Sequence, residues 1–351
     1  MLISCQQNSL PPIERFEVKR GTNIAHWLSQ SERRGIEREM FFTEEDVKAI
    51  AGMGFDHIRL PIDEEQMWDE NGARYPDAFG LMEKSINWCM ESNLRVIVDL
   101  HILRSHHFNH QEKPLWTSVA EQERFYDMWR DLSAALKQFS NGTLAYELMN
   151  EAVADDPELW NNLLANAFEA IRVLEPERTI VIGSNRWQSV HTFDDLKVPD
   201  GDSNILLSFH FYEPFLLTHF NASWTELKDY SGPVHYPGVI LTRGEYDNLP
   251  EEWKPVAEKW IDMEFNKEVM LGMWQQPIEK AKALGLPLYC GEFGIIKGPP
   301  ESDRLNWYKD MIQLFDEQDI GYANWNYKSG SFGLVENDGQ SNEALIGIVI
   351  P

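Results

Sequence analysis

Two glutamates in this sequence each follow a run of apolar and aromatic residues with the composition of a buried β-strand. Glu151 closes the stretch 144–151, and Glu292 lies near the end of the stretch 286–294. A carboxylate at the end of a buried strand costs free energy unless the protein pairs it or uses it. Two carboxyl groups that face each other across about 5–5.5 Å can divide a reaction, one attacking while the other donates a proton. Glu151 and Glu292 are therefore the candidate catalytic residues.

Further polar and aromatic side chains stand at the ends of other strand-like stretches, where they could support the two glutamates. Arg59 could hold Glu292 ionised by its positive charge, and Tyr212 could hydrogen-bond to Glu292. His210 lies two residues before Tyr212, so both side chains should point to the same side of a strand, where His210 could tune one of the acids. The candidates at these strand ends are Asn23, Arg59, His101, Asn150, Glu151, His210, Tyr212, Glu292 and Trp325.

Asn150 and Glu151 are adjacent in the sequence, which raises a local question. Consecutive side chains of an ideal strand point to opposite faces. Both residues can therefore serve one site only if the strand end is bulged or turning.

A metal site is the alternative use of these residues. His101, Glu151, His210 and Glu292 could in principle bind a divalent ion. Closely spaced histidine pairs are absent from the relevant strand ends, since His106, His107 and His110 belong to a loop. We therefore expect no metal and no other cofactor.

Strand-like stretches alternate with helix-like ones along the chain, without internal repeats or a convincing linker. This alternation predicts a (β/α)8 barrel, in which the carboxyl ends of all strands meet on one face. A doubly wound open sheet is the runner-up, although no Gly-x-Gly-x-x-Gly follows any strand. The predicted strands are 16–25, 55–61, 94–101, 144–151, 179–184, 204–210, 286–294 and 321–328, and the predicted helices are 43–54, 77–93, 120–139, 157–174, 272–285 and 302–318.

The 351 residues suit two domains or one large barrel, and the alternation favours one catalytic domain over 1–351. We expect residues 1–16 to form a loose polar lead and 28–42 an irregular loop. Residues 213–270 contain many aromatics and four prolines, which predicts an insertion between strand six and the helix after it. Such long segments are usually functional.

The net charge of −26 disfavours nucleic acids and acidic membrane surfaces as partners. No apolar run is long enough to span a membrane, and we expect a monomer. The residues around Cys5 look like the tail of a bacterial lipoprotein signal that lacks its basic and long apolar parts. We expect an extracellular or cell-surface protein anchored through Cys5 if a longer signal was trimmed, and a cytoplasmic one otherwise.

The ordered set of motifs resembles glycoside hydrolase family 5, the large cellulase family of clan A, over most of the chain from about Gly21 to Lys328. The matching pieces are Asn23, Arg59 in His-Ile-Arg-Leu-Pro, His101 in Asp-Leu-His, Asn150-Glu151, His210-Phe-Tyr212, Glu292 in Gly-Glu-Phe-Gly, and Trp325 in Asn-Trp-Asn-Tyr-Lys.

The resemblance implies a retaining mechanism in which Glu292 attacks the anomeric carbon while Glu151 protonates the leaving oxygen and later activates water. It also implies that Asn150 binds the sugar 2-hydroxyl and that Trp325 is a platform beneath the sugar. The residues expected to contact substrate are Asn23, Trp27, Trp187 and Trp325.

The leading expectation is an endo-β-1,4-glucanase that acts on cellulose-like or mixed-linkage β-glucans. A β-mannanase or a hydrolase of β-1,3-glucan or xyloglucan would use the same site, and a non-catalytic glycan-binding barrel or a metal-dependent barrel hydrolase are further alternatives. Two departures from the family pattern, His26 before Trp27 and Ile102 after His101, bear on substrate preference more than on mechanism.

Overall fold

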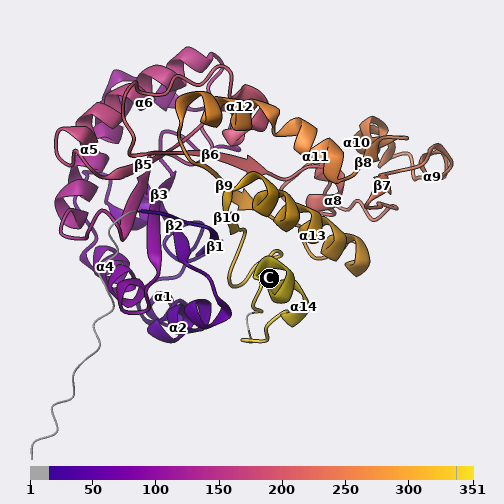
Figure 1. Ribbon diagram of the computed structural model, residues 1–351, viewed down its shortest axis with the longest axis horizontal. Coiled ribbons are helices and arrows are strands. Elements are labelled where there is room, and N and C mark those ends of the chain that lie inside the picture. The colour runs from indigo at the N-terminus through magenta and orange to yellow at the C-terminus, as the bar shows by residue number, and fades with distance from the viewer. Residues whose placement is uncertain (1–15, 337) are drawn as a thin grey trace, which may run out of the picture.

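Eight parallel strands close into a barrel in the computed structural model, which describes residues 16–336 and 338–351 (Figure 1). Around the ring the strand order is β1-β10-β9-β6-β5-β4-β3-β2, which confirms the predicted (β/α)8 barrel. Cys5 and Asn337 lie outside the described residues. The strands are β1 (Arg20–Asn23), β2 (His57–Asp63), β3 (Arg95–Ile102), β4 (Leu144–Glu147), β5 (Thr179–Gly183), β6 (Ile205–Phe211), β9 (Leu288–Phe293) and β10 (Gly321–Asn324).

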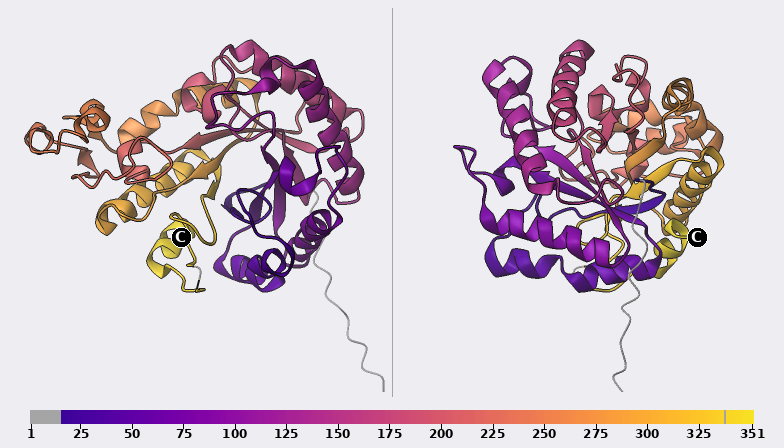
Figure 2. Two further views of the ribbon diagram at one scale, coloured as in Figure 1. Left: turned by 180° about the vertical axis from the view of Figure 1, so that it is seen from behind. Right: turned by 60° about the vertical axis from the view of Figure 1, so that its left-hand side comes forward.

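Helices surround the barrel on its outer side, as the views in Figures 1 and 2 show. Those that link successive barrel strands have apolar stripes that pack against the strands; α6, for example, buries Trp160, Leu164 and Ile171. The helices are α1 (Gly35–Phe41), α2 (Glu44–Met53), α3 (Glu64–Met67), α4 (Pro76–Glu91), α5 (Val119–Leu136), α6 (Pro157–Arg172), α7 (Asn185–Gln188), α8 (Phe215–Thr218), α9 (Arg243–Asp247), α10 (Lys254–Ala257), α11 (Lys267–Met273), α12 (Gln275–Leu284), α13 (Glu301–Gln318) and α14 (Glu343–Val349).

The interior of the barrel changes from apolar to polar along the strands. One cluster of buried residues fills it early in the strands, with Ile97, Ala145 and Leu206 among its members. Residues two apart in a strand share a face, so the positions two further along β3, β4 and β6 also face inward. These are Asp99, Glu147 and Ser208, and all three are buried. The sequence thus builds an apolar floor with a polar layer above it, toward the carboxyl ends.

The segment between β6 and α12 departs from the regular alternation. It contains α8 to α11 and a small antiparallel pair, β7 (Gly238–Val239) with β8 (Glu264–Phe265). In Figure 1 the part with β7, β8, α9 and α10 projects beyond the barrel. The segment contacts α13 through the Tyr236 hydroxyl, which donates to Asp310 at 2.6 Å. This segment corresponds to the insertion expected over 213–270.

Several boundaries differ from those expected. The stretch 28–42 is not all loop, because Gly35–Phe41 form α1. The first strand is only Arg20–Asn23, and the fourth ends at Glu147, four residues before Glu151 (151 − 147). The early end of the fourth strand matters most, because it changes how Asn150 and Glu151 reach the site.

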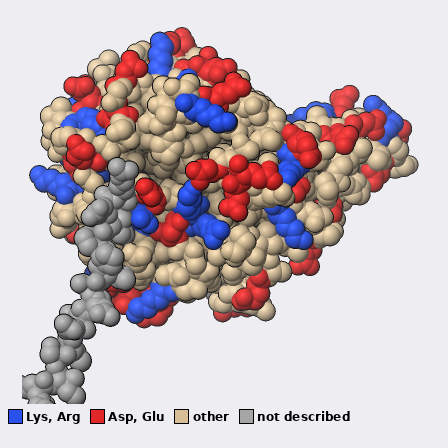
Figure 3. Space-filling model, in the orientation of Figure 1, with Lys and Arg blue, Asp and Glu red and all other residues tan. Residues whose placement is uncertain are grey.

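On the face shown in Figure 3, Lys and Arg are interspersed with Asp and Glu. In the part of the chain that the structure describes, no helix combines the length and the apolar character needed to cross a bilayer.

Candidate active site

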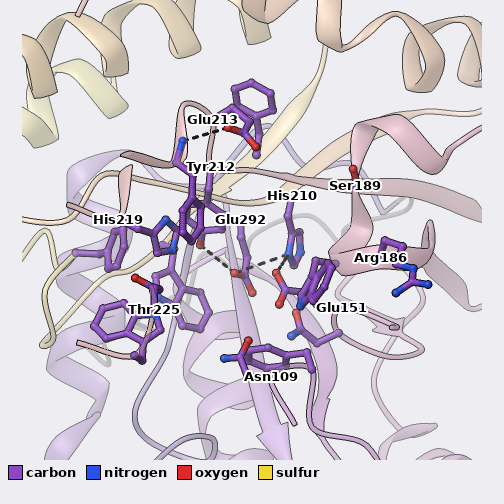
Figure 4. Close-up of a pocket in the computed structure, with 18 of the residues that line it drawn as sticks. Asn109, Glu151, Arg186, Ser189, His210, Tyr212, Glu213, His219, Thr225 and Glu292 are labelled. Atoms are coloured by element: carbon purple, nitrogen blue, oxygen red, sulfur yellow. Dashed lines mark hydrogen bonds and ion pairs between the residues drawn. The ribbon is translucent and has the colours of Figure 1, made fainter. Parts of the chain in front are cut away.

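A cleft of about 890 Å³ opens at the carboxyl ends of the barrel strands. Figure 4 shows Glu151, His210, Tyr212 and Glu292 gathered at its centre. Loops after β1, β3, β4, β5, β6 and β10 contribute to its walls. The residues that line it include His26, Gln30, His101, His107, Phe108, Asn109, Asn150, Glu151, Arg186, Trp187, His210, Tyr212, His219, Trp224, Glu292, Trp325 and Phe332.

Glu292 is held by a cation on one oxygen and a hydroxyl on the other. Arg59 Nη1 donates to its Oε1 at 2.7 Å, and the Tyr212 hydroxyl donates to its Oε2 at 2.9 Å. The pairing between β6 and β9 shifts by one residue between Cys290 and Glu292. Such a bulge re-aims the side chains that follow it, so Glu292 enters the cleft although it lies two residues from Cys290, which packs in the outer core.

Arg59 is itself fixed by two buried carboxylates, those of Glu147 and Asp99. It donates to both oxygens of Glu147, at 2.6 and 3.1 Å, and lies 3.0 Å from Asp99. Its remaining bonds reach the side-chain oxygens of Asn23 and Asn150, each at 2.9 Å. The guanidinium is fully buried, and buried charges persist when they are paired in this way.

Asp99 and Glu147 are functional residues that sequence reasoning missed. Their only signal is periodicity. Asp99 lies two residues before His101, so it shares the inward face of β3, and Glu147 lies two residues after Ala145 in the interior cluster.

The backbone after β4 turns so that both Asn150 and Glu151 face the site. Regular pairing ends at Glu147, and the Asn150 N–H then donates to Leu100 O at 3.1 Å. Glu151 has a φ of +44°, in the left-handed region that non-glycine residues seldom occupy. Its Oε1 forms a 3.0 Å hydrogen bond with His210 Nδ1. The turning strand end that both residues required is therefore present.

The two glutamates titrate in different surroundings. Burial and the charge of Glu292 raise the pKa of Glu151 well above its usual value. Burial also raises the pKa of Glu292, but the positive charge of Arg59 opposes that rise. Glu292 is therefore the first of the pair to ionise, and Glu151 keeps its proton to higher pH. This division suits an attacking carboxylate beside a proton donor.

Burial favours the neutral forms of His101 and His210. His101 Nδ1 bonds to Asp99 at 2.7 Å, and burial lowers the pKa of His101 to about 3. Burial likewise lowers the pKa of His210 well below its ordinary value. The His101 ring stacks on Trp325, with centroids 5.6 Å apart and planes 8° apart. Among the described residues, His210 Nε2 and Asn150 Nδ2 are buried without a partner, and both residues line the cleft.

The predicted substrate contacts divide into two groups. Trp325 and Trp187 line the cleft, and Trp187 is 43% exposed. Trp27 needs correction, because it is fully buried, donates to Arg38 O at 2.8 Å and packs on Phe42. Asn23 is also buried and contacts Arg59, Gly291 and the end of β10 rather than the cleft. Its place in the sequence showed proximity to the site but not the direction of its side chain.

One aromatic residue of the cleft was not singled out as a substrate contact. Trp224, in the insertion, is 52% exposed and lies near Phe332, with ring centroids 6.4 Å apart. The aromatic composition of 213–270 is a signal in the sequence that points to it.

Three of the four residues considered as metal ligands come together. Ligand atoms of Glu151, His210 and Glu292 lie within 4.8 Å of one another, whereas His101 is not among them. Arg59 Nη1 lies 2.7 Å from Glu292 Oε1, so the positive charge of Arg59 would repel a metal ion bound at this place.

Comparison with known proteins gives matches over nearly the whole chain. The family model for cellulase, glycosyl hydrolase family 5, matches residues 20–331. Endoglucanase C of Acetivibrio thermocellus is 34% identical over 332 residues, which cover 91% of this chain and 94% of that protein. Cellodextrinase A of Ruminococcus flavefaciens is 29% identical, over 86% of this chain and 83% of that protein.

Among solved structures, Cel5A of Thermotoga maritima in complex with cellobiose has a TM-score of 0.77 at 23% identity. The match covers 97% of this chain and all of that one, and it shows the common fold.

Proposed function

We propose, from the premise that this chain belongs to glycosyl hydrolase family 5, that it is a retaining endo-β-1,4-glucanase acting on cellulose-like or mixed-linkage β-glucans. Membership makes it a glycoside hydrolase. The finer proposal rests on one observation above all: Arg59 and Tyr212 both hold Glu292, while Glu151, with its raised pKa, faces it across the cleft.

In the first step the ionised Glu292 attacks the anomeric carbon, and the bond from that carbon to the leaving sugar oxygen breaks. Glu151 gives its proton to that oxygen, so the leaving chain departs as an alcohol. Arg59 and Tyr212 orient Glu292, and the neutral Tyr212 hydroxyl is kept protonated because burial and the charge of Glu292 raise its pKa well above the usual value.

In the second step a water molecule attacks the anomeric carbon of the glycosyl-enzyme. Glu151, now a carboxylate, takes a proton from that water, and the bond between sugar and Glu292 breaks. In this proposal Asn150 Nδ2 donates to the 2-hydroxyl of the sugar. The support is that Arg59 holds the other end of the amide at 2.9 Å and that Nδ2 has no partner.

The cleft has room for an oligosaccharide. Its volume of about 890 Å³ lies near the upper end of the roughly 300–1,000 Å³ typical of pockets for a single drug-sized ligand. Trp325 beside the glutamates and the exposed Trp187 offer flat apolar surfaces on which sugar faces can stack. The names of the relatives, an endoglucanase and a cellodextrinase, support a β-1,4-glucan as the substrate.

Product analysis on a panel of polysaccharides tests the proposal. Barley β-glucan and carboxymethylcellulose should be cut to mixtures of oligosaccharides, with laminarin, xyloglucan and mannan cut much more slowly. Faster cleavage of mannan, xyloglucan or laminarin would replace the proposed substrate. Binding of glucan without any product would contradict catalysis itself.

A further inference from the structure

The turn after β5 holds three consecutive non-glycine residues in the left-handed region. Arg186, Trp187 and Gln188 have φ values of +54°, +63° and +53°. Such conformations are unfavourable for residues with a Cβ, and they persist only where the surrounding structure imposes them. The contacts of Gln188 explain why the turn keeps this unfavourable conformation.

Gln188 joins the backbone of Glu151 to the carboxylate that holds Arg59. Its side-chain Oε1 accepts from the Glu151 N–H at 3.0 Å. Its Nε2 donates to Glu147 Oε1 at 3.2 Å and to Ser208 Oγ at 3.1 Å. The side chain is 1% exposed, so these bonds are shielded from water. Only a side chain that both donates and accepts at this place satisfies the Glu151 amide and the Glu147 carboxylate together.

The neighbouring strand leaves room for this side chain. A Cβ at Gly183, the last residue of β5, would lie 2.3 Å from Gln188 Cγ. Any other residue at 183 would force Gln188 away from Glu151. The glycine is therefore required by the close approach of Gln188.

The same turn clamps the chain that follows Glu151. Trp187 N–H donates to Ala152 O at 3.2 Å. Asn185 accepts from Ala154 N at 2.8 Å and donates to Ala154 O at 2.9 Å. Residues 151–154 belong to no helix or strand, so these contacts take the place of regular pairing.

We propose that Gln188 is a positioning residue for Glu151, an inference that rests on the proposed role of Glu151 as acid and base. The amide fixes the left-handed backbone of Glu151 and couples it to Glu147 and hence to Arg59. Without it, Glu151 moves away from the leaving oxygen while Glu292, held by Arg59 and Tyr212, keeps its place. The steps that need proton transfer are then impaired, and attack by Glu292 is not.

Two substrates separate these steps. Barley β-glucan has a poor leaving group and needs Glu151, whereas 2,4-dinitrophenyl β-cellobioside releases its phenol without protonation. For Gln188→Leu we expect kcat/KM on β-glucan to fall about 10²-fold, as small misplacements of catalytic groups do. The initial burst of dinitrophenol should keep its wild-type rate constant. Equal losses on both substrates, or no loss, would overturn the proposal.

A second variant keeps the test decisive if Gln188→Leu does not fold. In Gln188→Glu a protonated carboxyl can accept from the Glu151 amide and donate to Glu147, whereas the ionised form would repel Glu147. Its β-glucan activity relative to the wild type should therefore recover at acidic pH and be lost as pH rises. A ratio to wild type that does not change with pH would contradict the positioning role.

Gln66→Leu is the matched control. Gln66 is also buried and hydrogen-bonded, donating to Ser31 O at 2.6 Å, but it does not line the cleft. Relative to the wild type, Gln66→Leu should change the rates on the two substrates by the same factor. Glu151→Ala tests the underlying function in the same assay: if it shows no dependence on the leaving group, the proposed function fails. If it does and Gln188→Leu does not, only the role of Gln188 fails.

Discussion

Arg59 binds Glu292 and not Glu151. Its Nη1 lies 2.7 Å from Glu292 Oε1, and its other carboxylate partners are Glu147 and Asp99. The barrel thus directs one buried positive charge to one member of the glutamate pair. This contact, together with the hydrogen bond from Tyr212, favours the ionised form of Glu292 that the proposed mechanism requires.

The pH dependence of the reaction follows from the same asymmetry. kcat/KM should rise with pH as Glu292 loses its proton and fall at higher pH as Glu151 loses its own, because the pKa of Glu151 is the more strongly raised. In Glu292→Gln a negative neighbour disappears and Arg59 loses a partner. Both changes favour the ionised form of Glu151, so its pKa should fall.

Carbon-13 NMR titration of the glutamate side chains measures this shift. Glu175→Gln is the control, since Glu175 is a buried glutamate paired with Arg178 that does not line the cleft. A Glu151 pKa that stays the same or rises in Glu292→Gln would contradict the proposed effect of the Glu292 charge on Glu151.

Glu151→Ala should lose activity according to the leaving group. On β-glucan the expected loss is about 10²–10⁴-fold, the range that general acid–base catalysis contributes. Release of dinitrophenol from the aryl cellobioside should persist, with the glycosyl-enzyme accumulating because its hydrolysis lacks a base. Stopped-flow measurement of the burst and of the steady state tests this. Wild-type behaviour on β-glucan would place the acid elsewhere.

Trp187 and Trp27 were both expected to contact substrate, but replacing them by alanine should have different effects. Trp187→Ala should raise KM for β-glucan and leave the unfolding free energy nearly unchanged, because Trp187 is 43% exposed at the cleft. Trp27→Ala should cost about 3–5 kcal/mol of stability, as large-to-small changes in a core do. Initial-rate kinetics and urea unfolding of both variants distinguish these roles. A rise in KM without destabilisation in Trp27→Ala would contradict its place in the core.

Chelation should leave the activity intact. The positive charge of Arg59 already pairs with Glu292, and neither of the proposed steps uses a metal ion. Initial rates on β-glucan after dialysis against EDTA, compared with an untreated sample, test this. A complete loss that an added divalent ion restores would instead make Glu151, His210 and Glu292 metal ligands, the set whose atoms lie within 4.8 Å.

Patterns that repeat along the chain were predictable from the sequence. The buried parallel strands appear as continuous apolar runs, and their alternation with amphipathic helices specifies the barrel. His210 and Tyr212 lie at the end of β6 as expected, whereas Arg59 lies within β2 and not at its end. Each of the three makes the contact anticipated for it with Glu292 or Glu151.

Features that depend on contacts between distant segments were not predictable. Asp99 and Glu147 are single acidic residues within apolar strands, and only the closed ring reveals that they share Arg59. The bulge before Glu292 and the left-handed Glu151 arise from pairing with neighbouring strands and loops. The expectation that Trp27 contacts substrate was wrong, because packing on Phe42 and the hydrogen bond to Arg38 O hold its side chain in the core.

Covalent labelling tests the central claim most directly. A 2,4-dinitrophenyl 2-deoxy-2-fluoro-β-cellobioside should inactivate the enzyme with release of one dinitrophenol per site, because the fluorine slows hydrolysis of the glycosyl-enzyme. Peptide mapping by mass spectrometry should then find the sugar on Glu292. A label on Glu151 or on any other residue, or no label on an enzyme that still turns over β-glucan, would contradict the assignment of Glu292 as the nucleophile.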